Sequence, residues 1–559
     1  MGGSSILSPF GLFPGPNVQV TSYTWYPGDR NSRSECDLVT NPTDSDNLIA
    51  ASKRFYNYDR YEFTVATVYS LDGGVTWNKS ADLVLLSGTE AAGGYTDPAL
   101  AMDNNGTAYL VAEPDVWTNL PDPNDVLSVG MAVFGSENQG ASWSNPAVPT
   151  EKLPWMLDNR EDGADKQWAT ADNSSSSKFF GSVYVVWGAD TPLFFARKPA
   201  GQSKWVGAGS DTSPMAISGN ENVFAPAICV SGDGTIHIAW HVPSTSDMPS
   251  TDIFYMSSSD GGFSFSDPEL CASGIGDISL SFPPVPPADF PEFPGGKFRV
   301  LTLVSIAPIG ASGCIVAWAD ARGQFTRIFY RVRSDGGTWL GSNSGDPLLG
   351  AMGFSDQTPV QHFHPQLAVT PLGIIGCAFY EFGQGSDGVF RIDVRLASTA
   401  VFTNNFFFLA TVTDRPWDPS VDAPLSHGNP AVTFIGEYFG LDVVGEDFGV
   451  MWTDTRTGHQ ELWFSRVATW RSSARPPALN PALVAQLIAG VAVDGGGLAI
   501  VGGYPHPIPP WGPVTSILRL LAANGLASGV GGASGRRVQQ AIFSAIAEIA
   551  SQASKSYEE

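Results

Sequence analysis

Residues 70–77, with the sequence SLDGGVTW, decide the fold, because the same pattern returns along the chain. It reappears as SENQGASW at residues 136–143 and as SSDGGFSF at residues 258–265, and a shorter version, SDGGTW, occupies residues 334–339. The Asp or Asn side chain can accept backbone N–H groups inside its own turn, and Gly supplies a positive φ. The pattern therefore predicts a repeated hairpin turn whose acidic residues are structural rather than catalytic.

The aromatic residue that ends the pattern sets a period. Successive spacings are 66, 62, 60 and 74 residues, followed by a step of 131 residues, which is twice the usual interval. The missing unit should end near residue 404, where Phe402 stands. A regular period of this size is typical of a propeller or a solenoid. Seven repeats follow, marked by Trp77, Trp143, Trp205, Phe265, Trp339, Phe402 and Trp470.

Each unit also has the same internal order of strands. Second strands are rich in β-branched and aromatic residues, and a third strand precedes each turn. Four short strands per unit indicate a blade, so the sequence predicts an all-β, seven-bladed propeller, with six blades as the alternative. Residues 18–23 are expected to close the ring by pairing with the last blade. First strands, often containing Pro, are predicted at residues 97–100, 225–228, 364–367 and 429–432.

The chain divides into three parts on composition. Residues 1–16 form an N-terminal extension, residues 17–474 the propeller, and residues 475–559 an Ala- and Gly-rich tail predicted to be helical. Within the tail, Val538, Ile542, Ala545, Ile546 and Ile549 share one helix face. Such a stripe packs on the parent domain or supports self-association, so residues 478–559 are a candidate oligomerisation element.

Composition excludes several classes of protein. The formal charge of -25 argues against a nucleic-acid partner, which needs a basic face, and no stretch is apolar enough to predict a membrane span. Five cysteines in no metal-binding spacing are expected to be small buried hydrophobes. No secretory leader is visible at the N-terminus.

The repeated turns resemble those of Asp-box, or BNR-repeat, proteins of the sialidase superfamily, over roughly residues 30–471. The phrases AWADAR at 317–322, MWTDTR at 451–456 and IGEYFGL at 435–441 are similar to that group. The resemblance implies glycan recognition, with glycoside hydrolysis in some members, and favours an extracellular or cell-surface location. This sequence departs from true sialidases in having seven units instead of six and in lacking their F/Y-R-I-P motif; its nearest text is Phe298-Arg299-Val300.

Ligand sites in propellers lie at a mouth of the central channel, where first strands begin. Catalytic candidates there are Glu437 and Tyr438, as a carboxylate with a phenol, and Asp97 and Asp165. Adjacent residues on a strand point to opposite faces, so Glu437 and Tyr438 need a bulge to serve one centre.

Candidate substrate-binding residues are of two kinds. Lys166, Trp168 and His364 are predicted at the mouth as a cation, a stacking platform and a proton-transfer group. Arg322 and Arg456 follow Asp320 and Asp454 by two residues, a spacing that suits either substrate binding or a salt bridge repeated in two blades. His362 and His364 share a strand face, but no third ligand stands nearby in the sequence, so neither a metal nor a cofactor is predicted.

Two functions of different classes follow. The favoured one is a sialidase-like propeller that recognises a glycan or another polar polymer at the channel mouth, with glycoside hydrolase activity. The alternative is a non-catalytic assembly protein, in which the propeller is a rigid head and the tail drives oligomerisation. An enzyme predicts carboxylates and cations that converge at one mouth, whereas a lectin predicts exposed aromatic residues without a convergent acid pair.

Overall fold

The computed structural model describes residues 10–27, 30–57, 62–83, 94–117, 126–128, 130–144, 156–158, 165–207, 215–218, 223–243, 251–284, 290–354, 357–399, 404–426, 429–470, 498–501 and 504–507. The helices predicted in the tail lie outside these residues. Within the tail the description is limited to a short hairpin of β35 (Leu498–Val501) and β36 (Tyr504–Pro507).

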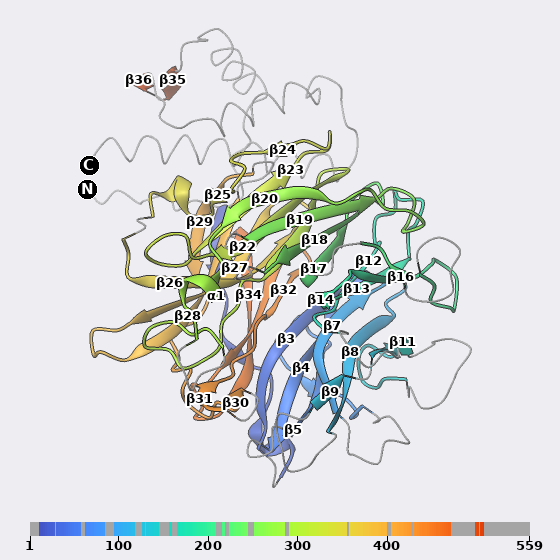
Figure 1. Ribbon diagram of the computed structural model, residues 1–559. Helices are drawn as coiled ribbons and strands as arrows, with labels where there is room; N and C mark the ends of the chain where they lie inside the picture. Colours follow the sequence, from blue (N-terminus) through green and yellow to red (C-terminus); the bar gives the residue numbers. More distant parts are fainter. Residues whose placement is uncertain are drawn as a thin grey trace, which may run out of the picture.

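Seven antiparallel sheets stand side by side in a closed ring, and the blue first sheet lies beside the orange last one (Figure 1). Each sheet has an inner strand that contacts the inner strands of both neighbouring sheets. The predicted seven-bladed propeller is therefore confirmed, and the six-bladed alternative is wrong. The inner strands are β3 (Ser32–Asn41), β7 (Gly94–Met102), β12 (Trp168–Ala171), β17 (Val223–Val230), β21 (Val304–Ile309), β26 (Val360–Val369) and β32 (Gly440–Val444).

The second and third strands of each blade form long antiparallel hairpins, as predicted. The second strands are β4 (Asp44–Asn57), β8 (Ala108–Trp117), β13 (Val183–Trp187), β18 (Ile236–Val242), β22 (Gly313–Asp320), β27 (Ile375–Gln384) and β33 (Asp447–Asp454). The third strands are β5 (Glu62–Ser70), β10 (Met131–Ser136), β15 (Phe194–Lys198), β19 (Thr251–Ser258), β23 (Arg327–Arg333), β28 (Phe390–Thr399) and β34 (Glu461–Trp470).

The fourth strands are shorter. Six of them follow the third strand of their own blade: β6 (Asn78–Lys79), β11 (Met156–Asp158), β16 (Met215–Ala216), β20 (Glu269–Ile275), β24 (Trp339–Leu340) and β29 (Phe406–Thr411). Small additions at blade edges and loops are β9 (Val126–Ser128), β14 (Ala189–Thr191), β25 (Asp346–Pro347), the pair β30 (Leu425–Ser426) and β31 (Asn429–Thr433), the 3₁₀ helices Tyr23–Trp25 and Gly350–Met352, and α1 (Ile278–Ser281).

The N-terminal segment supplies the outer strand of the seventh blade. β1 (Phe10–Pro14) and β2 (Val18–Gln19) both pair with β34, and Val18 lies opposite Phe464. The predicted ring closure by residues 18–23 is confirmed at Val18 and Gln19. The last blade is therefore completed by a strand from the other end of the chain, which ties the two ends of the propeller together.

The repeated turns share one hydrogen-bond arrangement. In the first, Asp72 Oδ1 accepts the Thr76 N–H at 2.8 Å, and Ser70 Oγ accepts the Gly74 N–H at 2.9 Å. The turn at residues 258–265 repeats both bonds at 2.9 Å. Gly74 has a φ of 90°, and a Cβ there would lie 2.2 Å from the Phe464 ring, so only glycine fits.

The aromatic residue after each turn packs against the preceding blade. Trp77 meets Phe464 of the seventh blade edge-on at 5.5 Å between ring centroids, and Trp339 meets Tyr255 at 5.3 Å. Trp205, whose own turn lacks the readable pattern, contacts Tyr109 in the same manner at 6.1 Å. Each such pair contributes about 0.5–1.5 kcal/mol beyond its buried area, so these rings fasten neighbouring blades together.

Two sequence expectations about the last blade are wrong in detail. Trp470 ends β34, so it stands where the other blades begin their turn, and the turn is unnecessary because β1 supplies the fourth strand. Residues 429–432 were expected as the inner strand, but they belong to β31, which pairs with β30. The inner strand is β32, which follows Gly436 rather than a proline. Phe402, the predicted marker of the sixth unit, lies outside the described residues.

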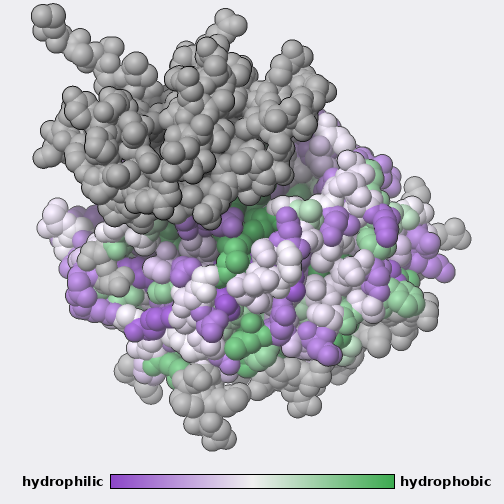
Figure 2. Space-filling view, turned by 90° about the horizontal axis from the view of Figure 1, so that it is seen from above, coloured by the Kyte–Doolittle hydropathy of each residue, from purple (hydrophilic) through white to green (hydrophobic). Residues whose placement is uncertain are grey.

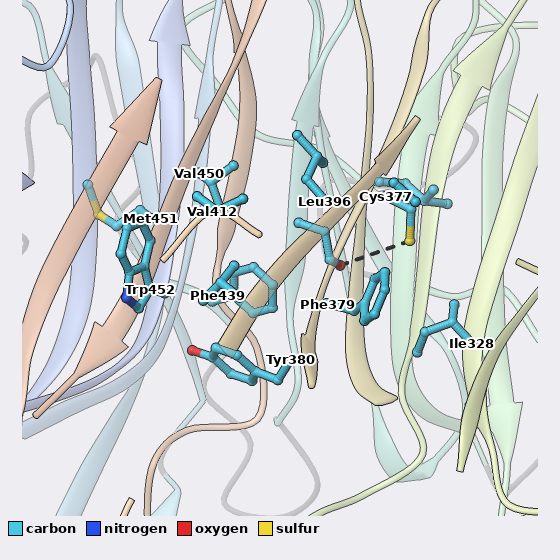
Figure 3. Close-up of a cluster of buried hydrophobic side chains, with 14 of the residues drawn as sticks. Ile328, Cys377, Phe379, Tyr380, Leu396, Val412, Phe439, Val450, Met451 and Trp452 are labelled. Carbon is cyan, nitrogen blue, oxygen red and sulfur yellow. Dashed lines mark hydrogen bonds between the residues drawn. The ribbon is translucent and has the colours of Figure 1, made fainter. Parts of the chain in front are cut away.

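The core lies between blades and is rich in large rings. Trp187, Trp240, Trp318 and Trp452, all from second strands, are fully buried. Figure 3 shows the contact of the sixth and seventh blades, where Tyr380 of β27 packs on Phe439 with ring centroids 4.5 Å apart. All five cysteines are buried free thiols, as expected.

The visible surface mixes hydrophilic side chains with small hydrophobic patches (Figure 2). Among the described residues, no helix is long and apolar enough to cross a membrane.

Candidate functional site

One backbone feature recurs where the inner strands begin. Among the described residues, seven that are not glycine have a positive φ, and five of these lie at this position. Gly436 takes the corresponding place in the seventh blade, with a φ of 91°. The five residues are Glu35, Asp97, Lys166, Ala225 and His364, with φ between 47° and 55°.

This conformation accompanies a β-bulge. The pairing register shifts between Ser34 and Asp37 in β3, and between Thr96 and Ala99 in β7. β17 and β26 shift in the same way. A left-handed non-glycine residue costs roughly 1–3 kcal/mol, and such strain gathers at functional sites. Ala225 shows that the backbone conformation belongs to the blade itself, whereas the ionisable residues at the four other positions add chemistry to it.

The bulges bring charged side chains of several blades together at one end of the channel, here called the start mouth (Glu35, Asp97, Asp165, Lys166, Arg299, His364 and Glu437). Lys166 is its centre. Its Nζ lies 2.7 Å from Asp97 Oδ2 and 2.8 Å from Glu437 Oε2. The other oxygen of Glu437 lies 2.7 Å from Arg299 Nε. Glu437 is fully buried, so two cations are needed to hold its charge.

The pKa values of the carboxyl groups of the start mouth are shifted in opposite directions. Burial raises the pKa of Glu35 to about 8, with the Asp97 charge adding to the rise, while Lys53, 3.8 Å away, opposes it. Burial alone would also raise the pKa of Glu437, but Arg299 and Lys166 outweigh it and lower this pKa to about 2. At neutral pH the Glu35 carboxyl therefore keeps its proton, and the Glu437 carboxylate is ionised.

Asp97 and Asp165 differ in the same sense. Burial favours the neutral form of Asp97, yet the ammonium groups of Lys166 and Lys53 hold its pKa well below the usual range. The pKa of Asp165 is raised by partial burial and by the negative charges of Asp97 and Glu437, against the pull of Lys166. The Asp165 side chain is 36% exposed, which makes it the most accessible carboxyl among these ion pairs.

Two aromatic rings lie beside the start mouth, toward the channel. Trp168 and Tyr438 meet edge to face at 5.7 Å, and the Tyr438 hydroxyl donates to the Pro98 carbonyl at 3.3 Å. A small cavity of 40 Å³ lies against Asp97, Lys166 and both rings. Burial and the surrounding carboxylates raise the pKa of Tyr438 well above its ordinary value, so its phenolate form is disfavoured.

Beyond these rings the channel widens into a cavity of 630 Å³, here called the channel cavity, which runs to the end where the inner strands stop. Trp168, Ser305 and Gln366 line both cavities. The charged residues that line the channel cavity are Asp37 and Asp442, whose carboxylates accept backbone N–H groups of Leu100 and Thr40.

His362 and His364 do not lie together as a pair of metal ligands. His362 Nε2 lies 2.9 Å from Glu381 Oε2 in the sixth blade. His364 instead lies toward the start mouth, where burial lowers its pKa to about 3, with Arg299 and Lys166 adding to the effect against Glu437. Its ring is therefore neutral, and neither ring nitrogen has a hydrogen-bond partner among the described residues.

Arg322 and Arg456 do not belong to the start mouth, because the guanidinium of each is bound by an Asp two residues before it in its own blade. Arg456 Nε donates to Asp454 at 2.9 Å, and Arg322 Nε donates to Asp320 at the same distance. A tryptophan two residues before each Asp, Trp452 or Trp318, donates to the same carboxylate. The identical arrangement in two blades is a repeated structural element, in agreement with the salt-bridge interpretation of their spacing.

Sequence reasoning missed several members of the start mouth. Glu35 comes from the first blade, together with its neighbour Lys53, and occupies the same strand position as Asp97. Arg299 lies within Phe298–Val300, the stretch nearest to the sialidase motif, which lacks the proline of that motif. The alignment of strand starts would have indicated Glu35, but no local signal connects Arg299 with Glu437.

Asp97, Glu113 and Asp165 bring three carboxylate oxygens within 4.8 Å of one another, a spacing that a metal ion could use. The Lys166 ammonium already lies against this group, 2.7 Å from Asp97 and 3.8 Å from Asp165. A cation of the protein itself therefore already lies against two of the three carboxylates.

No protein-family model matches the chain, and no curated protein matches its sequence. Several solved structures are similar in fold. A protein of unknown function from Dyadobacter fermentans is 13% identical over 82% of this chain and 100% of that one, with a TM-score of 0.43. A variant of the NanB sialidase from Streptococcus pneumoniae is 14% identical over 66% and 67% of the two chains, with a TM-score of 0.38.

The GH93 α-L-arabinofuranosidase of Fusarium graminearum, solved with arabinobiose, is 11% identical over 82% of this chain and 98% of that one, with a TM-score of 0.36. Similarities this distant say nothing about what this chain binds.

Proposed function

We propose that the protein is a sialidase-like propeller of the Asp-box class that binds a glycan at the start mouth and hydrolyses a glycosidic bond there. One observation carries the proposal. An accessible carboxyl with a raised pKa, Asp165, adjoins carboxylates whose pKa values are lowered, Asp97 and Glu437. Glycoside hydrolysis uses such a pair, a carboxyl whose pKa is raised beside a carboxylate whose pKa is lowered.

In the proposed mechanism Asp165 protonates the leaving oxygen, because it combines a raised pKa with exposure to the mouth. Glu437 stabilises the positive charge that develops on the sugar ring. As the leaving group departs, a water molecule attacks the anomeric carbon, and the proton it releases restores the Asp165 carboxyl. Lys166 holds Asp97 and Glu437 in their ionised forms and positions them. Tyr438 and Trp168 form the wall behind the site. The raised pKa of the Tyr438 phenol makes this residue an unsuitable nucleophile.

The alternative function, a non-catalytic assembly protein, is favoured by one observation of its own. Both oxygens of Glu437 are already paired with cations, as in a purely structural ion network. Under this alternative, residues 478–559 carry the self-association, and their deletion converts the oligomer to a monomer in analytical ultracentrifugation.

A substrate screen separates the two functions. The wild type is assayed with fluorogenic sialosides, arabinofuranosides and pyranosides of the common hexoses, and its binding is measured on a glycan array. We expect turnover of at least one glycoside, and a loss of kcat of about 10²–10⁴-fold in Asp165→Asn and Glu437→Gln. Asp387→Asn, which alters an exposed ion pair with Arg391, is the matched control and should keep the wild-type kcat.

Absence of turnover and of glycan binding would exclude the proposed function and leave the assembly alternative. Turnover that survives in both variants would remove Asp165 and Glu437 from the reaction.

A further inference from the structure

A second hollow lies on the opposite face of the ring, between the turns of the second and third blades. It has a volume of 790 Å³, within the range of about 300–1,000 Å³ that is usual for small-ligand sites. Four turns form its walls: residues 103–107 and 135–144 of the second blade, and residues 180–181 and 198–203 of the third. We call this hollow the turn groove.

The turn groove has aromatic side chains held in fixed positions. Trp143 is half-buried, and its Nε1 donates to Thr67 Oγ1 of the first blade at 2.8 Å, which fixes its indole ring. Phe180 of the third blade, on the other side of the groove, is 38% exposed. Among the described residues, few large apolar side chains are exposed to this extent. Tyr109 also borders the hollow but is buried at 2% exposure, fixed by its packing on Trp205 at 6.1 Å and by a 3.1 Å hydrogen bond to Asp103.

Polar side chains of both kinds surround these rings. Asn105, Gln202 and Ser203 are exposed and supply uncharged donors and acceptors. The charged side chains of the lining are Asp103, whose carboxylate is held by N–H groups of its own turn and by Tyr109, exposed Glu137, and Lys198, whose Nζ lies 5.4 Å from the centre of the Tyr109 ring. A ligand that matches this lining has flat apolar faces and many hydroxyl groups, and carries no net charge.

We infer that the turn groove is a second carbohydrate site, which binds a short stretch of a neutral polysaccharide independently of the start mouth. The inference does not depend on the proposed hydrolysis, because the groove lies on the opposite face of the ring. Aromatic rings supply stacking area at little cost in conformational entropy, and amide and hydroxyl groups supply adaptable hydrogen bonds.

Affinity electrophoresis tests this inference. The full-length protein is run in native gels that contain soluble arabinan, xylan, galactomannan or dextran, and Kd is obtained from the retardation. The test uses Asp165→Asn as background, so that hydrolysis cannot consume the polymer. We expect retardation by at least one neutral polymer.

Ser203→Trp should fill the groove and weaken that retardation at least tenfold. Ser175→Trp, an exposed serine outside the groove lining in a neighbouring turn of the third blade, is the matched control and should bind as the background does. If Ser203→Trp does not fold, Phe180→Ser serves instead, since its exposed ring can be removed without opening the core.

Three results would overturn the inference. One is that no neutral polymer retards the protein. Another is that retardation is the same with and without Ser203→Trp or Phe180→Ser. A third is that Glu437→Gln abolishes retardation while the groove variants leave it unchanged, which would place the polymer at the start mouth and support the proposed function instead.

Discussion

The two ends of the channel are built from the same seven strands but have opposite character. At the start mouth, bulges with left-handed residues bring Glu35, Asp97 and Lys166 into one buried polar cluster, in which Lys166 forms an ion pair with Asp97. At the other end the inner strands stop in turns whose acidic residues accept hydrogen bonds from the same turn, as Asp103 accepts the N–H groups of Asn105 and Thr107. Local turns need only their own residues, whereas the start mouth needs charges from separate blades.

Because of this difference, substitutions at the two ends should change the stability of the fold to different extents. A carboxylate that accepts hydrogen bonds from its own turn loses little if a distant residue changes. A buried carboxylate such as Glu437, whose partners come from the third and fifth blades, depends on all of them. Removing the shared cation, Lys166, should therefore destabilise the start mouth most.

Lys166→Met should have the largest effect on stability. It keeps the length of the side chain but leaves the buried carboxylates of Asp97 and Glu437 without their ammonium, which costs roughly 3–5 kcal/mol. Urea denaturation at neutral pH measures the loss of unfolding free energy. Lys79→Met, which breaks the exposed pair with Asp82, is the control and should cost less than about 1 kcal/mol. Equal losses in the two variants would show that the start mouth is no more dependent on its ion pairs than the surface.

The pH dependence of stability tests the role of Glu35. Its pKa rises from 4.5 in the unfolded chain to about 8 in the fold, so the folded state holds a proton that the unfolded state releases in between. The unfolding free energy contributed by this group is therefore present at low pH and falls as the pH rises from 4.5 to 8. Glu35→Gln should remove that slope, and its difference from the wild type should grow toward pH 8.

The measurement is a set of urea titrations between pH 5 and pH 9. Glu269→Gln, at a more exposed carboxyl paired with Arg333, should run parallel to the wild type. A Glu35→Gln profile parallel to the wild type would mean that Glu35 does not hold its proton in the fold.

Glycine substitutions in the turns test the other end and should have smaller effects. Gly74→Ala combines a φ of 90° with a Cβ only 2.2 Å from Phe464, so both strain and a clash oppose it. Gly201→Ala has a φ of 70° but meets nothing within 4 Å, and should cost only the strain, about 1 kcal/mol. Thermal unfolding compares the two, and a smaller loss for Gly74→Ala would contradict its role in fastening the first blade to the seventh.

Much of the fold follows from local patterns. The turn of residues 70–77 and its copies predict the hairpins, and the regular spacing of their aromatics predicts seven blades. Even the closure at Val18 and Gln19 follows, because a β-rich segment outside the repeats needs a strand edge to pair with. The errors at residues 429–432 and at Trp470 arose where the last blade departs from the repeat, since a period cannot reveal its own exceptions.

The candidate site was predicted in part. Glu437, Tyr438, Asp97, Asp165, Lys166, Trp168 and His364 were all chosen from their place at strand starts, and the fold brings them to one region. Arg322 and Arg456, chosen from their spacing, have a repeated partner of their own. Glu35, Lys53 and Arg299 were not chosen, because each contact joins segments far apart in the chain.

The sequence alone determined the blade, its turns and their number, because a hairpin turn and an alternating strand depend on neighbours within a few residues. Tertiary structure decided the chemistry. Which side chains face the channel depends on the bulge in each inner strand, and which charges meet depends on closure of the ring. The Lys166 ammonium has its partners in Asp97 of the second blade and Glu437 of the seventh, and only the closed ring brings those blades around one axis.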